Sequence, residues 1–149
     1  MKLNQLLNLD GRSALVTGAA GHLGSVFCET LYEMGARIAM VDISPGVVEC
    51  AAKLDASGTR AKGFSVDLED EDALRDCFAQ VTAWTSGLEI LVNNAAFVGT
   101  TGLTGWGVPF AEQQSSTFRR ALEVNLTSVF TLCQLAAPLL AVRGCGSII

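Results

Sequence analysis

The sequence predicts an α/β fold in which a doubly wound parallel sheet is covered by helices on both faces. Short apolar runs alternate four times with segments of helical periodicity, and these runs lack a strict alternation of polar and apolar residues. This pattern is typical of strands that are buried on both faces and joined by right-handed crossovers. Half of the 149 residues are hydrophobic and 17% are charged, which fits extensive burial and excludes disorder.

The first two expected strands are Ala14–Thr17 and Arg37–Asp42, with a helix between them that ends at Gly35. Its expected buried stripe consists of Leu23, Phe27, Leu31 and Met34. Ser44 and Pro45 then predict the N-cap and first turn of a second helix, which runs to about Ala56.

A third strand is expected at Ala61–Asp67, and an acid-rich first turn begins the helix that follows it. The buried stripe of that helix consists of Leu74, Phe78 and Val81. A fourth strand at Leu88–Val92 leads into the sequence NNAA, and Gly146–Ile149 opens a fifth strand. We expect one domain over residues 1–149, incomplete at its C-terminus because the sheet is truncated at the start of the fifth strand.

A long helical segment is expected from Ser115 to Val142, bent near Asn125 and Pro138. Its stretch from Val124 to Val142 has no charged residue and approaches the length of a membrane span. Polar residues within the stretch dilute its apolarity, however, so a helix buried on all sides is the better interpretation. We therefore expect no membrane partner.

The stretch TGAAGHLG follows the first strand and opens the first helix. Gly18 can turn the chain out of the strand, Gly21 can let a phosphate approach the backbone, and Gly24 can let the helix pack on the sheet. Free N–H groups at the start of the helix would then face a pyrophosphate. The context of strand, turn and helix makes this loop a candidate dinucleotide site.

Asp42 ends the second strand, 18 residues after Gly24. Its carboxylate can accept hydrogen bonds from ribose hydroxyls, a contact worth roughly 1.5–3 kcal/mol. It would repel a 2′-phosphate, and Ile43 and Ser44 offer no cation. The expected cofactor is therefore NAD(H) rather than NADP(H). The alternative is that Asp42 only caps the helix that follows.

Four motifs together resemble the short-chain dehydrogenase/reductase family, whose cofactor domain is of the Rossmann type. They are TGAAGHLG, Asp67-Leu68, Asn93-Asn94-Ala95-Ala96 and Val124-Asn125. The resemblance covers nearly the whole chain and implies hydride transfer between nicotinamide and an alcohol or carbonyl of a small-molecule substrate. It also implies a homo-oligomer, a dimer or tetramer, for the full-length form.

The resemblance assigns roles to individual residues. Asp67 would contact the adenine amino group, with Leu68 beside it. Asn94, Ala95 and Ala96 would line the two riboses. Val124 would lie near the cofactor, and Asn125 would hold a water of the proton relay.

Two motifs depart from the common pattern of the shorter-chain branch of this family. His22 replaces the middle glycine of T-G-x-x-x-G-x-G, and the spacing T-G-x-x-G-x-x-G found here is more typical of the branch that acts on nucleotide sugars. Ala96 also replaces the commoner glycine of NNAG. The downstream motifs still favour the shorter-chain branch.

His22, the single histidine, is badly placed to act as a base, and no second metal ligand lies near it in the sequence. We expect Leu23 and His22 to face the cofactor from the first helical turn, with the backbone of His22 toward phosphate. The glycine-rich loop from Phe97 to about Glu112 predicts a substrate lid. Trp106 in this loop either stacks on the substrate or only packs the loop on the domain. This stretch is also similar to short-chain dehydrogenases that modify surface glycans or flagellin sugars.

The acid–base residues that the family uses, a serine and a Tyr-x-x-x-Lys, have no counterpart in this sequence. The single tyrosine is Tyr32, and Ala36 stands four places later. Two interpretations follow: the cofactor half of a longer dehydrogenase, inactive alone, or a non-catalytic dinucleotide-binding or regulatory module.

The net charge of −5 provides no basic patch for nucleic acid, so no such partner is expected. The five cysteines form no C-x-x-C pair or metal-ligand spacing, which predicts reduced thiols in a cytoplasmic protein without a metal site.

Overall fold

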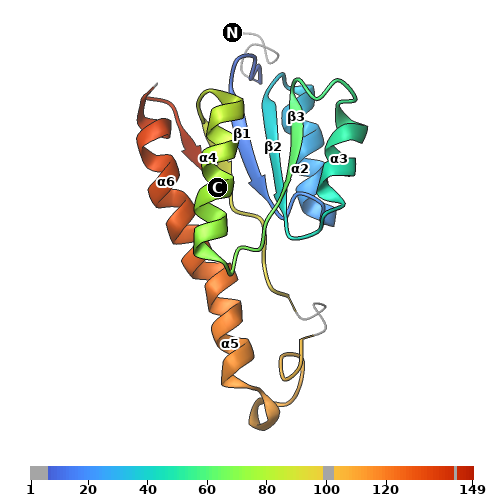
Figure 1. Ribbon diagram of the computed structural model, residues 1–149, viewed down its shortest axis with the longest axis vertical. Coiled ribbons are helices and arrows are strands. Elements are labelled where there is room, and N and C mark those ends of the chain that lie inside the picture. Colours follow the sequence, from blue (N-terminus) through green and yellow to red (C-terminus); the bar gives the residue numbers. More distant parts are fainter. Residues whose placement is uncertain (1–6, 99–102, 143) are drawn as a thin grey trace.

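The computed structural model describes residues 7–98, 103–142 and 144–149. Five parallel strands form one sheet in the order β3-β2-β1-β4-β5, with helices on both faces (Figure 1). The strands are β1 (Ser13–Thr17), β2 (Arg37–Asp42), β3 (Ala61–Ser65), β4 (Ile90–Val92) and β5 (Ser147–Ile148). The helices are α2 (His22–Glu33), α3 (Val47–Leu54), α4 (Glu71–Thr85), α5 (Ser115–Leu122) and α6 (Ser128–Val142), with a 3₁₀ turn η1 (Phe110–Glu112) and a π segment η2 (Glu123–Thr127). The predicted α/β class is confirmed.

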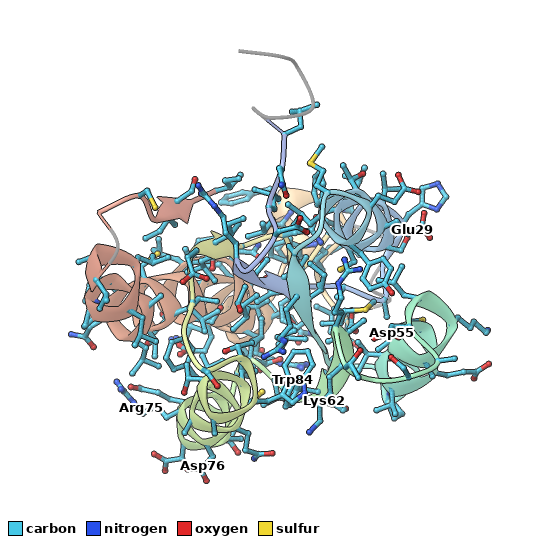
Figure 2. All side chains as sticks on the ribbon, turned by 90° about the horizontal axis from the view of Figure 1, so that it is seen from above. Glu29, Asp55, Lys62, Arg75, Asp76 and Trp84 are labelled. Atoms are coloured by element: carbon cyan, nitrogen blue, oxygen red, sulfur yellow. The ribbon has the colours of Figure 1, made fainter. Side chains whose placement is uncertain are left out.

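Alternate residues of β1, β2 and β4 enter two separate cores, one on each face of the sheet. Leu15 of β1 packs in the core under α4 and α6, whereas its neighbours Ala14 and Val16 pack in the core under α2 and α3. Figure 2, viewed from above, shows these helix pairs on opposite sides of the sheet. Burial on both faces explains why the strands read as continuous apolar runs.

The expected stripe of α2 is wrong at its first two positions. Leu23 is 64% exposed and Phe27 is 40% exposed, while Gly24 and Cys28 are buried. Gly24 lies against the carbonyl of Gly18, so the small-residue face of the helix must turn toward the sheet. The larger apolar side chains one position earlier are thereby turned outward. The expected end is confirmed, since Gly35 follows the helix with a φ of +105°.

Other boundaries shift by one to three residues. The second helix begins at Val47, because Ser44 and Pro45 form a turn before it, and it ends at Leu54. β3 ends at Ser65 rather than at Asp67, and β4 begins at Ile90 rather than at Leu88. The expected burial of Leu74, Phe78 and Val81 on α4 is confirmed, as are the acids in its first turn, where the Asp70 carboxylate accepts a hydrogen bond from the Ala73 N–H.

The expected burial of the long helix on all sides is wrong for this chain. Ser115–Val142 is long and apolar enough to cross a membrane by length and composition, a test that core helices also pass. One face of α6 packs into the core through Leu132, Ala136 and Leu140, while Phe130 on the opposite face is 65% exposed. The helix therefore covers the sheet with one side only.

Candidate cofactor-binding cleft

A cleft of about 390 Å³ lies at the carboxyl ends of β1 to β4, where the strand order reverses between β1 and β4. Crevices at such a switch point are the usual ligand sites of open α/β sheets. All twelve residues that the sequence predicted for cofactor binding line this one cleft: Gly18, Gly21, His22, Leu23, Gly24, Asp42, Asp67, Leu68, Asn94, Ala95, Ala96 and Val124. The structure thus brings together residues that are up to 106 positions apart in the sequence.

Three glycines shape the turn between β1 and α2. Gly18 has a φ of +64°, and a Cβ at this position would come within 2.9 Å of Asn94 Nδ2 and of Ala95 Cα. A Cβ at Gly24 would overlap the Gly18 carbonyl, whereas a Cβ at Gly21 would meet only the Gly18 oxygen, at 3.1 Å. Gly18 and Gly24 therefore permit close packing, and Gly21 keeps the floor of the cleft open.

The N-terminus of α2 faces the cleft with its first-turn residues. No side chain caps this terminus, and its first turn contains no acidic residue. The first N–H groups of a helix lack intrahelical partners and carry the positive end of the helix dipole. This end of the cleft can therefore accept an anionic group such as a phosphate.

Asp42 connects the end of β2 to the glycine turn. Its Oδ2 accepts a hydrogen bond from the Ala20 N–H at 2.9 Å, and its Oδ1 accepts one from the Ser44 N–H at 2.9 Å. The carboxylate thus holds the turn after β2, but the capping alternative is wrong, because the N-cap of α3 is Gly46 and no side chain caps that helix. Since two carboxylate oxygens offer about four acceptor positions, it still has capacity for ligand hydroxyls.

Thr17 and Asn94 join the ends of β1 and β4. The Thr17 hydroxyl oxygen accepts hydrogen bonds from the N–H groups of Asn94 and Ala95, both at 3.1 Å. The Asn94 Nδ2 donates to the carbonyls of Thr17 at 3.0 Å and Gly18 at 3.2 Å. These bonds fix the backbone of two cleft walls relative to each other.

Asp67 and Leu68 form the wall after β3. Leu68 is buried, while the exposed Asp67 carboxylate accepts a hydrogen bond from the Glu69 N–H at 3.0 Å. Asp67 therefore shapes its own turn and leaves acceptor capacity toward the cleft.

The π segment η2 carries Val124 and Asn125. Val124 is buried against the cleft. The Asn125 Oδ1 accepts a hydrogen bond from the Phe97 N–H at 2.7 Å, and its Nδ2 donates to the Phe97 carbonyl at 3.3 Å. π segments inside α-helices are frequent at functional sites, and this one directs Asn125 at the segment that follows β4.

His22 and Trp106 differ in their relation to the cleft. His22 is the first residue of α2, is exposed and lines the cleft. Trp106 is half-buried in the turn before η1 and is not among the lining residues. Gly99 and Gly102 of the expected lid lie outside the described residues. No group of three or more metal-ligating side chains occurs in the described part of the chain.

Sequence reasoning missed four residues of this site. Ile43, Phe97 and Val98 also line the cleft, and Thr17 organises two of its walls. Thr17 is the first residue of TGAAGHLG, Ile43 and Phe97 stand directly beside Asp42 and Ala96, and Val98 is one place further, so proximity to a strand end was the available signal. The uncapped helix N-terminus, the glycine turn and the acid after β2 together form the donor and acceptor set of a dinucleotide site, which fits the family's cofactor.

The fold is that of a Rossmann-type nucleotide-binding protein. A family model described as short chain dehydrogenase matches residues 12–149, and the chain belongs to this family. It is 32% identical over 142 residues to D-threitol dehydrogenase of Mycolicibacterium smegmatis, covering 95% of this chain and 52% of that protein. It is 35% identical over 129 residues to human 15-hydroxyprostaglandin dehydrogenase [NAD(+)], covering 84% of this chain and 42% of that protein.

Solved structures agree with this assignment. A structure of NAD⁺-bound xylitol dehydrogenase matches 93% of this chain and 52% of its own, with a TM-score of 0.80 and 26% identity. A blue fluorescent protein from a metagenomic library, in complex with NADPH, matches 95% of this chain and 55% of its own, with a TM-score of 0.81 and 27% identity. Relatives thus bind either cofactor, and the chain spans about half the length of the curated relatives it matches.

Proposed function

We propose that this chain binds NAD(H) and forms the cofactor-binding half of a dehydrogenase that acts on an alcohol or carbonyl of a small molecule. The observation that carries the proposal is the position of Asp42, at the end of β2 and hydrogen-bonded to the glycine turn. A carboxylate there favours ribose hydroxyls and opposes a 2′-phosphate. The adjacent Ile43 and Ser44 provide no positive charge to offset that repulsion.

The residues of the cleft would hold the cofactor in an extended arrangement. The first turn of α2 would receive the pyrophosphate, with His22 and Leu23 contributing backbone N–H groups. Asp42 would bind the adenosine ribose, Asp67 and Leu68 the adenine, and Asn94, Ala95, Ala96 and Val124 the riboses and nicotinamide side. The bound nicotinamide would supply the hydride acceptor or donor.

Asn125 is proposed to support the proton relay of the active site. Both ends of its side-chain amide are already bonded to the Phe97 backbone, which supports a role through its position and backbone rather than as an acid or base. Trp106 remains a proposed substrate contact, in a turn that precedes η1.

The substrate class is proposed from the relatives. D-threitol dehydrogenase, sorbitol dehydrogenase and cis-4-hydroxycyclohexanecarboxylate dehydrogenase are named for substrates with secondary or primary alcohols. A polyol or a sugar-derived alcohol is therefore our proposed substrate, and the reaction would be its oxidation or the reverse reduction.

Cofactor titration tests the proposal. We expect the purified protein to bind NADH more tightly than NADPH, as measured by quenching of protein fluorescence or by calorimetry. Replacing Asp42 by Asn should raise the Kd for NADH about tenfold, since charge-assisted hydrogen bonds are worth roughly 1.5–3 kcal/mol. The same replacement should reduce the preference for NADH over NADPH. A thermal melt controls for loss of the bonds to Ala20 and Ser44. Comparable binding of both cofactors by the wild type would contradict the NAD assignment.

A second candidate function is nucleotide binding without catalysis. The single tyrosine, Tyr32, lies on α2 beneath the Arg60 guanidinium, whose carbon is 4.0 Å from the ring centroid, and it does not line the cleft. We therefore expect the 149-residue chain to bind NADH but to show no NAD-dependent oxidation of a polyol panel. Measurable turnover by this chain would overturn the second candidate function. It would also overturn the expectation that the reaction needs acid–base residues other than those of the 149-residue chain.

A further inference from the structure

Arg120 of α5 connects two walls of the cofactor cleft. Its guanidinium makes a bidentate contact with the Glu69 carboxylate, with Nε 2.8 Å from Oε2 and Nη2 2.6 Å from Oε1. The same guanidinium carbon lies 5.5 Å from the ring centroid of Phe97, at a cation–π distance. Glu69 follows β3 and Phe97 follows β4, so one side chain contacts two segments that are 28 residues apart.

Each of these segments leads directly to residues that line the cleft. The Glu69 N–H donates to the Asp67 carboxylate, and the Asp70 N–H donates to the Asp67 carbonyl at 3.2 Å. A displacement of Glu69 would therefore move Asp67 and Leu68. On the other wall Phe97 itself lines the cleft and is bonded to Asn125.

The charges around Arg120 favour this arrangement. The hydrogen bonds and charge of Glu69, together with the nearby charge of Asp67, raise the pKa of Arg120 above its usual value. Arg120 thus offsets two carboxylates that would otherwise repel each other beside the cleft. A planar guanidinium suits this position, because it can make a bidentate contact with a carboxylate and also stack on a ring.

A second arginine–glutamate pair, on α4, provides a comparison for Arg120. Its arginine, Arg75, is labelled in Figure 2 on the outer side of α4. Arg75 makes a similar contact with Glu71, with Nε 3.0 Å and Nη2 2.6 Å from Oε1, but this pair lies four residues apart on the exposed face of one helix. Such a pair can stabilise only its own helix. Arg120 instead joins α5 to the segments that follow β3 and β4, through Glu69 and Phe97.

We propose that Arg120 is a positioning residue that fixes the β3 end of the cleft by holding Glu69 and Phe97 together. This inference rests on the proposed function in one respect: when NAD(H) binds, the β3 end of the cleft receives the adenine. Loss of Arg120 would then weaken binding of the adenosine half of the ligand more than binding of the nicotinamide half.

Amide hydrogen exchange tests the positioning without any ligand. In Arg120→Met, which keeps the aliphatic stem but lacks the guanidinium, we expect faster exchange at Glu69, Asp70 and Phe97 than in the wild type. Arg75→Met is the matched control and should leave these three amides unchanged. Equal exchange at these amides in Arg120→Met and Arg75→Met would overturn the proposal.

Binding of fragments of NADH then shows which part of the cleft the loss of Arg120 affects. Arg120→Met should raise the Kd for NADH and for ADP-ribose about threefold to fivefold, the range of a modest ion pair, with a smaller rise for nicotinamide mononucleotide. Arg120→Lys should recover part of the loss. Equal loss for all three ligands would indicate a general structural defect and would contradict the positioning role.

These measurements distinguish a failure of the proposed function from a failure of the proposed positioning role of Arg120. If the wild type does not bind NADH but Arg120→Met loosens the three amides, the proposed function fails while the positioning of the walls stands. If NADH binds equally to both proteins and the amides are unchanged, the positioning role fails while the proposed function stands.

Discussion

Single residues of the glycine turn meet two different physical demands. Gly24 lies in the contact between α2 and the turn, where an added Cβ would overlap the Gly18 carbonyl and come within 2.9 Å of Ala19 Cα. Gly21 is the N-cap of α2, has an extended backbone with φ −75° and is exposed to the cleft. Packing therefore depends on one glycine and ligand access on the other.

Two alanine substitutions separate these demands. Gly24→Ala should lower the free energy of unfolding by about 1–3 kcal/mol, the usual cost of overpacking, and should also abolish tight NADH binding. Gly21→Ala should leave urea unfolding nearly unchanged but weaken NADH binding, because its Cβ would stand where a phosphate approaches. Urea titration and cofactor titration of both variants check this. Unchanged NADH affinity in Gly21→Ala would argue against a phosphate at this turn.

The residues of the cleft were predictable to the extent that local patterns mark strand ends. Asp42, Asp67 and Asn94 each follow an apolar run, and parallel strands place such positions at one edge of a sheet. Arg120 has no such signal. It lies in the last turn of α5, and its contacts with Glu69 and Phe97 depend on how α5 is directed after the sheet has formed.

At the scale of elements, the connection from α3 to β3 is organised by one carboxylate. Asp55 accepts hydrogen bonds from the N–H groups of Ser57 at 3.0 Å, Arg60 at 2.7 Å and Ala61 at 3.3 Å, and also from the Ser57 hydroxyl at 2.5 Å. These bonds hold the pKa of Asp55 well below its usual value of 3.8. The ionised carboxylate therefore stabilises this turn.

Asp55→Asn should lower the urea midpoint, because the amide cannot accept on both of its polar atoms. A carboxylate whose pKa is lower in the folded state stabilises the fold at pH values above its unfolded pKa of 3.8. This stabilisation is lost as the pH falls from 3.8 through the folded-state pKa. The difference between wild type and Asp55→Asn should thus be full at pH 6 and shrink below about pH 4. Asp76→Asn, on the outer face of α4 in Figure 2, is the control. A difference that grows toward acid pH would contradict this role.

The elements show why helix faces were harder to predict than helix positions. Periodicity placed α2 correctly, but Gly24 and Cys28 face the sheet in place of Leu23 and Phe27 because the helix packs closely on the glycine turn. Likewise, the uncharged composition of α6 indicated burial on every side, although one face of α6 is exposed. Composition reports how apolar a helix is, but it does not report which surfaces of the chain are available to cover it.

At the scale of the whole molecule, α5, η2 and α6 form one continuous helical arm that extends past the carboxyl ends of the strands (Figure 1). Four apolar residues repeat every fourth position along its outer side and are 54%, 42%, 62% and 65% exposed: Phe118, Leu122, Leu126 and Phe130. We call this set the outer stripe. Contiguous exposed apolar surface of this kind is typical of interaction sites in globular proteins.

We expect the protein to be a homo-oligomer, a dimer or tetramer, that pairs two copies of the outer stripe. A two-fold axis lets a stripe meet its own copy, and interdigitated side chains at i and i+4 are a common form of helix packing. Light scattering after size exclusion should then give at least twice the 15.6 kDa mass of one 149-residue chain. The double variant Leu126→Gln with Phe130→Glu should give the mass of one chain.

Phe110→Glu is the matched control, since Phe110 is 90% exposed but lies in η1, outside the stripe. A wild-type mass of one chain, or an unchanged oligomer in the double variant, would show that the stripe does not join copies of this protein.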